Sequence, residues 1–420
     1  RQSCIDYAKE QNITIRKNRI TAASTQIDVK TAKAALFPSL SFSTSQQVVN
    51  RPYQETSSRV SGSEIISSNS KTSYNGNYGL NASWTLYNGN KRLKTIQQEK
   101  LNNQVAELDV ATSENNIQES IAQVYIQILY AAESVKVNES TLQVSIAQRD
   151  RGQELLNAGS IAKSDFAQLE AQVSTDRYQL VTAQATLEDY KLQLKQLLEL
   201  DGENEMNIYL PALSDENVLA PLPTKKDVYI RALSLRPEIE ASKLNVEASE
   251  LGIGIAKSSY LPTISLSAGI GTNHTSGSDF TFGEQVKNGW NNSIGLSVSV
   301  PIFNNRQTKS AVQKAKLQYE TSMLSLLDEQ KTLYKTIEGL WLDANSAQQR
   351  YAAANEKLKS TQISYELISE QFNLGMKNTI ELLTEKNNLL QAQQEQLQAK
   401  YMAILNMQLL KFYQGDQLAI

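Results

Sequence analysis

The feature that most constrains this 420-residue chain is an internal duplication. Asn157-Ala158-Gly159 recurs as Asn373-Leu374-Gly375, and Leu86-Tyr87-Asn88 recurs as Ile302-Phe303-Asn304, in both cases 216 positions later (375 − 159 = 216). Units of this size are too long for solenoid repeats, so the sequence predicts two large half-molecules. The predicted organisation is repeat 1 over residues 1–200, an equatorial inter-repeat segment over 201–224, repeat 2 over 225–414 and a C-terminal tail over 415–420.

Both repeats are predicted to begin with a helix and to continue into two β-strands. The opening helices cover about residues 3–36 and 225–258, and they end before Pro38 and Pro262 because proline disfavours a helical conformation at the preceding residue. Apolar and small polar residues then alternate along four stretches without a charged side chain, which is typical of strands with one apolar face. These predicted strands cover about residues 39–47, 74–87, 261–272 and 290–303.

The rest of each repeat carries a seven-residue apolar period, which predicts long helices that pack as coiled coils. The helix over about 89–157 and its counterpart in repeat 2 are each followed by a returning helix of about half that length. A returning helix and an opening helix together match the long helix in length. We therefore expect end-to-end stacking between the repeats, with 163–200 on 225–258 and 378–414 on 3–36.

The predicted strands cannot form a complete membrane structure within one chain. Transmembrane barrels have at least about eight strands, and an open sheet would leave unpaired backbone groups in lipid, so several chains must share one barrel. The small polar residues suit a water-filled lumen, and no stretch approaches the ~20 apolar residues of a membrane-spanning helix. Aromatic residues near the strand ends suit a girdle at the membrane interfaces: Trp84, Tyr87, Trp290 and Phe303. In a soluble sheet, Tyr74, Tyr78, Trp84 and Trp290 would be ordinary core residues.

Composition argues against several classes of function. The 41 basic and 44 acidic side chains give a net charge of −3, without the basic field that nucleic acid requires. With one Cys and one His, which lies in a polar loop, we expect no metal site, no cofactor and no catalytic triad, and so neither a hydrolase nor another enzyme. The mean hydropathy of −0.41 fits a barrel with a polar, water-filled lumen together with long polar helices. Since the sequence begins at Arg1, we expect any export signal to have been removed.

Several motifs together resemble those of the TolC-like outer membrane factors of bacterial efflux and type I secretion. They are Ala35–Ser41, Trp84–Gly89, Val300–Asn304 and the two glycine turns, in this order and duplicated. The resemblance implies a homotrimer with a 12-stranded β-barrel, four strands per chain, continued by a long α-helical coiled-coil barrel. It also implies an outer-membrane location that extends into the periplasm, and a passive exit duct joined to a periplasmic adaptor and an inner-membrane pump.

The same resemblance implies roles for residues at the two turns. The adaptor-binding tips would be Ala158-Gly159-Ser160 and Leu374-Gly375-Met376, where Ser160 departs from the family's apolar third residue. Glu381 matches the first acidic position of the entrance gate, whereas Thr384 replaces the second, and Asp165 and Lys377 match the gate latch. Without the resemblance, the glycines predict helix C-caps, and the acidic residues in the first turns predict capping and dipole compensation.

A soluble or periplasmic coiled-coil scaffold or adaptor is the alternative interpretation. It accounts for the seven-residue period but not for two pairs of charge-free alternating strands. Solubility of the purified chain without detergent would favour the scaffold.

Overall fold

The computed structural model describes residues 2–53, 57–61, 64–68, 71–200, 208–209 and 218–418. Most of the predicted inter-repeat segment 201–224 and the last two residues of the predicted tail lie outside the described residues. The chain divides into two compact units. The first comprises Arg1–Ala22, Ala106–Ser242 and Ser325–Ile420, and the second comprises Ala23–Val105 and Lys243–Leu324.

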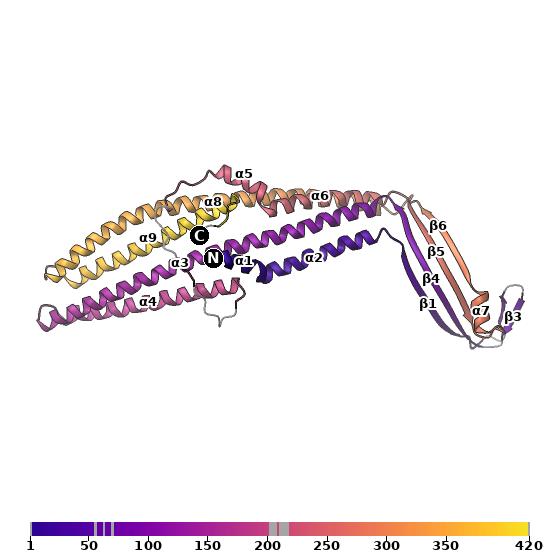
Figure 1. Ribbon diagram of the computed structural model, residues 1–420, viewed down its shortest axis with the longest axis horizontal. Helices are drawn as coiled ribbons and strands as arrows, with labels where there is room; N and C mark the ends of the chain where they lie inside the picture. Colours follow the sequence, from indigo (N-terminus) through magenta and orange to yellow (C-terminus); the bar gives the residue numbers. More distant parts are fainter. Residues whose placement is uncertain are drawn as a thin grey trace. The chain divides into compact units, whose positions relative to one another are not determined.

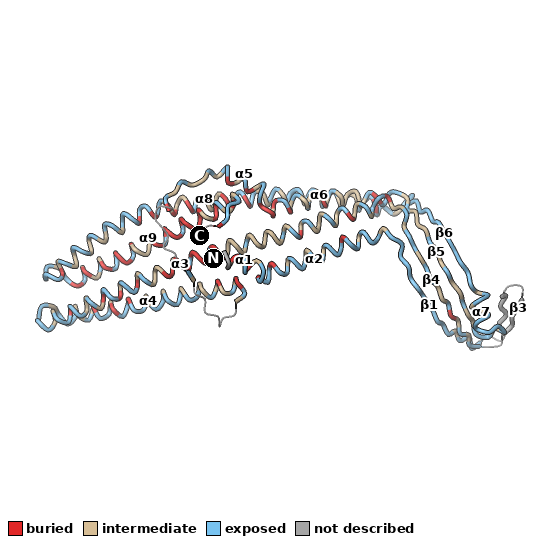
Figure 2. Tube along the Cα trace, in the orientation of Figure 1, coloured by how far each residue is buried: buried red, intermediate tan, exposed pale blue. Residues whose placement is uncertain are grey.

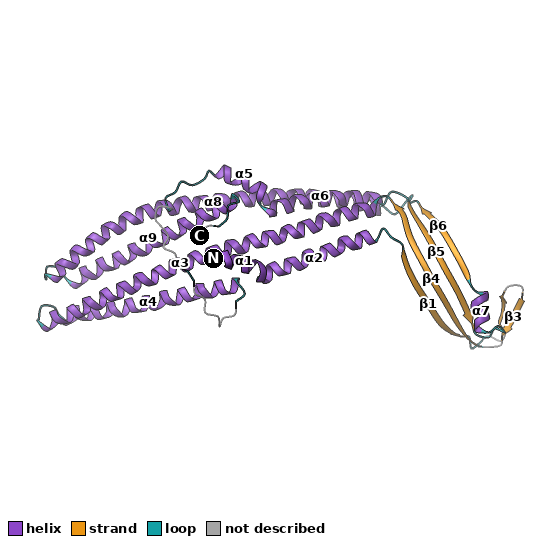
Figure 3. Ribbon diagram, in the orientation of Figure 1, coloured by secondary structure: helices purple, strands orange, loops and turns teal. Residues whose placement is uncertain are grey.

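Each half of the chain contains helices, strands, a long helix and a returning helix, in that order (Figures 1 and 3). The helices are α1 (Gln2–Gln11), α2 (Ile13–Ala34), α3 (Lys91–Asn157), α4 (Lys163–Leu197), α5 (Lys225–Leu235), α6 (Pro237–Ser258), α7 (Phe282–Asn288), α8 (Gln307–Asn373) and α9 (Thr379–Tyr413). The strands are β1 (Ser39–Asn50), β2 (Ser57–Ser61), β3 (Glu64–Ser68), β4 (Thr72–Asn88), β5 (Thr263–Thr275) and β6 (Asn291–Ser299). No helix in the described part of the chain is both long and apolar enough to cross a membrane.

The four predicted strands are confirmed and form one antiparallel sheet in the order β1-β4-β5-β6. The prediction was too long at one end, because β6 stops at Ser299, two residues before Pro301, and proline has no N–H for a ladder. The β2–β3 hairpin and α7 were not predicted, since they lie in polar segments without a clear apolar period. The strands of the two repeats are joined by the pairing of β4 with β5.

One face of this sheet is apolar and exposed. The register places Phe42 opposite Leu80 and Leu80 opposite Ile270, so the apolar residues of neighbouring strands share a face. None of the four strands contains Asp, Glu, Lys or Arg. Ile294 and Leu296 of β6 are 82% and 64% exposed. Within the described sheet, β1 and β6 are edge strands, each paired on one side only.

The helices of the first unit bury the predicted coiled-coil positions. Ile121 and Ile128 of α3, and Ile337 and Ala344 of α8, are at most 5% exposed. Figure 2 shows that buried residues gather along these helices, whereas the strands are mostly exposed. The seven-residue period therefore marked the buried sides of the two helical hairpins, α3–α4 and α8–α9.

The predicted stacking between repeats is wrong in its partners. Asn12 caps α2 through its side-chain oxygen and donates from Nδ2 to the carbonyl of Leu197 at 3.1 Å, so α4 meets the opening helix of its own repeat. In repeat 2, the Arg236 guanidinium, next to Pro237 at the start of α6, lies 4.0 Å from the ring centre of Tyr413 in α9. Both opening helices are also broken, at Asn12 and Arg236, rather than continuous. Because the opening helices have equal length, length alone could not choose between the pairings.

Candidate functional site

The two turns that end the long helices share one backbone geometry. Gly159 and Gly375 have φ angles of 72° and 73°, which only glycine adopts without strain. In the first turn, the amide of Gly159 donates to Leu156 and that of Ser160 donates to Leu155. The second turn repeats this arrangement through Gly375 and Met376, so both helices end in a Schellman motif. The structure thus confirms the predicted glycine C-caps.

The second tip is fixed by a complete capping box. The amide of Glu381 donates to Asn378 Oδ1 at 2.9 Å, and the amide of Asn378 donates to Glu381 Oε2 at 3.2 Å. Lys377 Nζ donates to the other oxygen, Oε1, at 2.6 Å. The hydrogen bond from Lys377 and that from the Asn378 amide lower the pKa of Glu381, so this half-exposed carboxyl is ionised at neutral pH.

The first tip has the same backbone but different chemistry. Asp165 accepts a 3.4 Å hydrogen bond from the amide of Ala162, which has no side-chain acceptor to return one. The predicted latch partners Asp165 and Lys377 are each engaged within their own tip, and no contact between them is among the interactions of the described residues. Thr384 is exposed, and its hydroxyl donates to the carbonyl of Ile380 at 2.8 Å.

The surfaces of the tips also differ. Leu374 and Met376 are 69% and 70% exposed, while Phe372 and Leu382 behind them are buried. Ala158 and Ser160 are exposed in the first tip, where they present a smaller and more polar surface. An apolar binding partner would therefore find more contact area at the second tip.

The predicted girdle residues lie at both ends of the sheet. Trp84 donates from Nε1 to the carbonyl of Leu36 at 2.7 Å, and Tyr87 and Phe303 lie at the same, helix-proximal end. Trp290 precedes β6 at the opposite end, where Asn291 pairs with Gly271. Trp290 and Phe303 are 57% and 84% exposed. Aromatic residues at both ends of an apolar band are typical of membrane interfaces.

One cluster inside the helical unit was missed. Asp176 of α4 and Lys386 of α9 form a buried ion pair, together with Ser145 of α3. Asp176 lies seven residues after Leu169 and seven before Ala183, at a position of the seven-residue period that packing reserves for apolar side chains. A charge at such a position was the available signal, but its partner is 210 residues away along the chain.

Comparison with known proteins assigns the chain to a family. The family model for outer membrane efflux proteins matches residues 4–199 and 228–415, one segment in each half of the chain. The outer membrane protein TolC of Escherichia coli is 23% identical over 311 residues, covering 72% of this chain and 62% of TolC. The outer membrane efflux protein BepC of Brucella suis is 24% identical over 290 residues, covering 69% of this chain and 60% of BepC.

The matched region is therefore about three fifths of the length of these curated relatives. Among solved structures, the transmembrane channel CusC superposes with a TM-score of 0.84 at 18% identity, covering 99% of this chain and 92% of CusC. The TolC-like fold is thereby shown, with a helical part and a four-stranded sheet in each chain. Because the family model covers both halves, the chain belongs to the outer membrane efflux protein family.

Proposed function

We propose that this chain is the exit duct of a tripartite efflux or secretion system. Three copies form a homotrimer that conducts substrates passively across the periplasm and the outer membrane. A periplasmic adaptor and an inner-membrane pump deliver the substrates and supply the energy, since the sequence contains no nucleotide-binding motif. Family membership supports this assignment. The strongest structural support is the exposed, charge-free apolar face of the four-stranded sheet.

The exposed apolar face and the edge strands of the sheet favour a larger, closed barrel. Its four strands expose a charge-free apolar face, and within the described part of the chain β1 and β6 each have one unpaired edge. In lipid, each unpaired backbone group would cost several kcal/mol, so the edges must pair. Pairing β1 of one chain with β6 of the next closes a 12-stranded barrel from three chains, with the apolar face outward. A soluble scaffold would gain nothing from exposing this face.

The helical tips are proposed as the entrance and the docking site. Three copies of Glu381, kept ionised by Lys377 and the capping box, form an acidic ring that favours cations. Thr384 lies one turn further along α9 and adds no charge. Contact of Lys377 with Asp165 in the assembled trimer acts as the latch, and Lys377 would have to leave Glu381 to make it. The adaptor grips Ala158-Gly159-Ser160 and, over a larger apolar area, Leu374-Gly375-Met376.

The decisive experiment is reconstitution of the purified protein into planar bilayers after its mass has been measured in detergent. We expect a trimer that forms channels with a cation-selective reversal potential in a KCl gradient. Glu381→Gln should move that potential towards zero. Glu395→Gln, at an exposed carboxylate of the same helix paired with Lys357, is the matched control and should leave it unchanged. A protein that is monomeric without detergent and forms no channels would refute the proposal.

A further inference from the structure

Three polar side chains from three helices meet in the interior of the helical unit. Lys386 Nζ of α9 donates to Asp176 of α4 and to Ser145 of α3, and the Ser145 hydroxyl donates to the same Asp176 oxygen. The side chains of Lys386 and Asp176 are 3% and 1% exposed. These three residues, here called the buried cluster, link the first hairpin (α3–α4) to the second (α8–α9).

The two charges of this cluster depend on one another. Burial lowers the pKa of Lys386, and the hydrogen bond and charge of Asp176 oppose that shift. A buried charge that loses its partner is strongly destabilising, whereas a fully paired one is tolerated. Both Asp176 oxygens are paired here, because the second one accepts from Gln172 Nε2 at 2.9 Å. The hairpins therefore cannot separate at this point without exposing or stranding a charge.

The buried cluster is not a product of the internal duplication. The position equivalent to Asp176 in repeat 2 is Ala392 (176 + 216 = 392), and the position equivalent to Lys386 in repeat 1 is Glu170 (386 − 216 = 170). Ala392 is buried and Glu170 is exposed. The ion pair thus joins α4 of the first hairpin to α9 of the second, and the equivalent positions, Glu170 and Ala392, do not form a second such pair. Coiled-coil packing in general does not require a pair of this kind.

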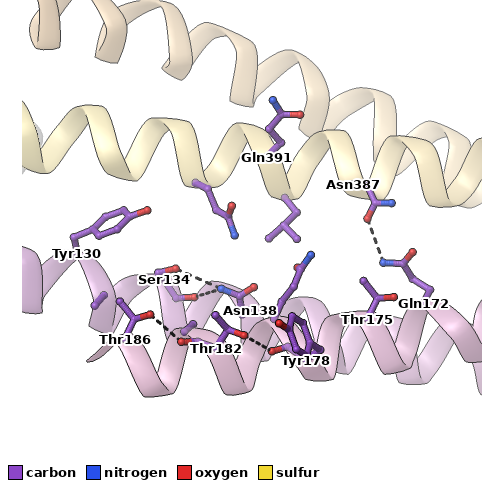
Figure 4. Close-up of a pocket in the computed structure, with 15 residues that line it drawn as sticks. Tyr130, Ser134, Asn138, Gln172, Thr175, Tyr178, Thr182, Thr186, Asn387 and Gln391 are labelled. Atoms are coloured by element: carbon purple, nitrogen blue, oxygen red, sulfur yellow. Dashed lines mark hydrogen bonds between the residues drawn. The ribbon is translucent and has the colours of Figure 1, made fainter. Parts of the chain in front are cut away.

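Beside the cluster, a cavity of about 550 Å³ lies between α3 and α4 on one side and α9 on the other, and its lining contains no charged residue. Figure 4 shows the bridge from Gln172 to Asn387, 3.2 Å long, at one end of this cavity, with Tyr130 and Thr186 towards the other. Beside this cavity, α4 and α9 are linked by polar contacts, the buried cluster and the bridge from Gln172 to Asn387.

The cluster also lies close to the proposed entrance. Lys386 follows Glu381 by five residues within one continuous helix, which is about 7.5 Å along the axis at 1.5 Å per residue. A continuous helix is rigid over such a distance, so a contact that fixes Lys386 also fixes the position of Glu381. We propose that Asp176, Lys386 and Ser145 are positioning residues that set the place of Glu381 at the entrance by fastening α9 to the first hairpin. This inference rests on the proposed function and names a restraint separate from the tip residues.

The test compares single-channel conductance and reversal potential in planar bilayers, for variants that form trimers. Lys386→Met removes the ammonium at similar length, and Asp176→Asn keeps the volume and one acceptor. We expect both to raise the fraction of time in a high-conductance state roughly tenfold, equivalent to about 1.4 kcal/mol, and to weaken cation selectivity. The exchange Asp176→Lys with Lys386→Asp restores the pair and should restore wild-type conductance, which a purely volumetric role would not do.

Lys357→Met is the matched control, because Lys357 forms an exposed ion pair with Glu395 that stays within the second hairpin. It should behave as wild type. If wild type itself forms no channels, the proposed function fails. If wild type conducts and Asp176→Asn is indistinguishable from it, the positioning role is overturned. If the single variants open but the exchanged pair stays equally open, the ion pair is not the cause and the inference also fails. Should Lys386→Met not assemble, Asp176→Asn alone decides.

Discussion

The contact between α9 and the start of α6 at Arg236 gives the sharpest test of how a returning helix is held against the opening helix of its repeat. The Arg236 side chain is 6% exposed and pairs with Glu119 at 2.9 Å and Glu238 at 2.8 Å. Its guanidinium also lies 4.0 Å from the ring centre of Tyr413. Burial would lower the pKa of Arg236, but Tyr413 and the two carboxylates outweigh it and raise the pKa. The buried guanidinium is therefore matched by two carboxylates and one aromatic ring.

Arg236→Met should destabilise this junction by about 3 kcal/mol, because it leaves two largely buried carboxylates without their cation. This figure is at the low end of the range for buried pairs, since Glu119 and Glu238 retain 18% and 20% exposure. A loss of this size increases local opening roughly a hundredfold. The first turn of α6, where the amide of Ile239 donates to the carbonyl of Arg236, would report it directly.

Hydrogen exchange measured by mass spectrometry on the trimer is the appropriate assay. Peptides covering 236–242 should exchange about a hundred times faster in Arg236→Met, while the junction at Asn12 should keep its wild-type rate. Burial raises the pKa of Glu119 even beside Arg236, and the variant should raise it further. Because a protonated carboxyl needs no cation, the difference should shrink as the pH falls through that raised pKa.

Arg19→Met is the matched control. Arg19 pairs with Glu114 at 2.9 Å but is 45% exposed, so its loss should cost less than about 1 kcal/mol. If exchange at 236–242 in Arg236→Met changed no more than exchange around Arg19 in that control, the reasoning about the buried pair would be wrong.

Three further predictions concern the tips and the hairpins. Gly375→Asp should abolish efflux while trimers persist, because a side chain there meets nothing within 4 Å and costs only about 1–2 kcal/mol of left-handed strain. Gly152→Ala should destabilise the trimer to heat by about 1–3 kcal/mol, because its methyl group would come within 2.3 Å of Leu169. The cation selectivity due to Glu381 should be complete at pH 5 and should persist as the pH falls through about 4.3, the ordinary value for Glu, because the pKa of Glu381 is lowered.

Each of these predictions has an outcome that contradicts it. Normal drug efflux by Gly375→Asp would remove the second tip from adaptor binding. Gly339→Ala in α8 is the control, because a methyl group there meets nothing within 4 Å and should stabilise the helix. If Gly152→Ala stabilised the trimer as much as Gly339→Ala does, the predicted clash with Leu169 would be wrong. Because the pKa of Glu381 is lowered in the folded protein, its ionised form stabilises the fold at pH values above the unfolded pKa of about 4.3. This stabilisation is lost as the pH falls through the lowered pKa. Selectivity that disappears near pH 6 would point to another carboxyl.

Local patterns in the sequence were sufficient for the strands, the buried sides of the long helices and the glycine turns, because each depends on residues close together in the chain. Alternation over 74–87 identified β4, and the position of Gly375 identified a glycine C-cap, which the structure shows to be a Schellman turn. The stacking partners were predicted wrongly, since equal helix lengths do not distinguish two pairings. What separates them is specific chemistry, such as Asn12 reaching the carbonyl of Leu197. The pairing of Asp176 with Lys386 depends on tertiary contacts that no local pattern encodes.

The single occurrence of the buried cluster has a consequence for stoichiometry. Three chains in the proposed ring would bring six helical hairpins of almost the same backbone together, and hence six seams. The ion pair of Asp176 and Lys386 lies within a chain, so it fastens only three of these seams, in alternation with three that lie between chains. A protein that docks on the seams would meet two kinds of site. It would bind as three copies if it distinguishes them and as six if it does not, and the ring would widen with threefold rather than sixfold symmetry.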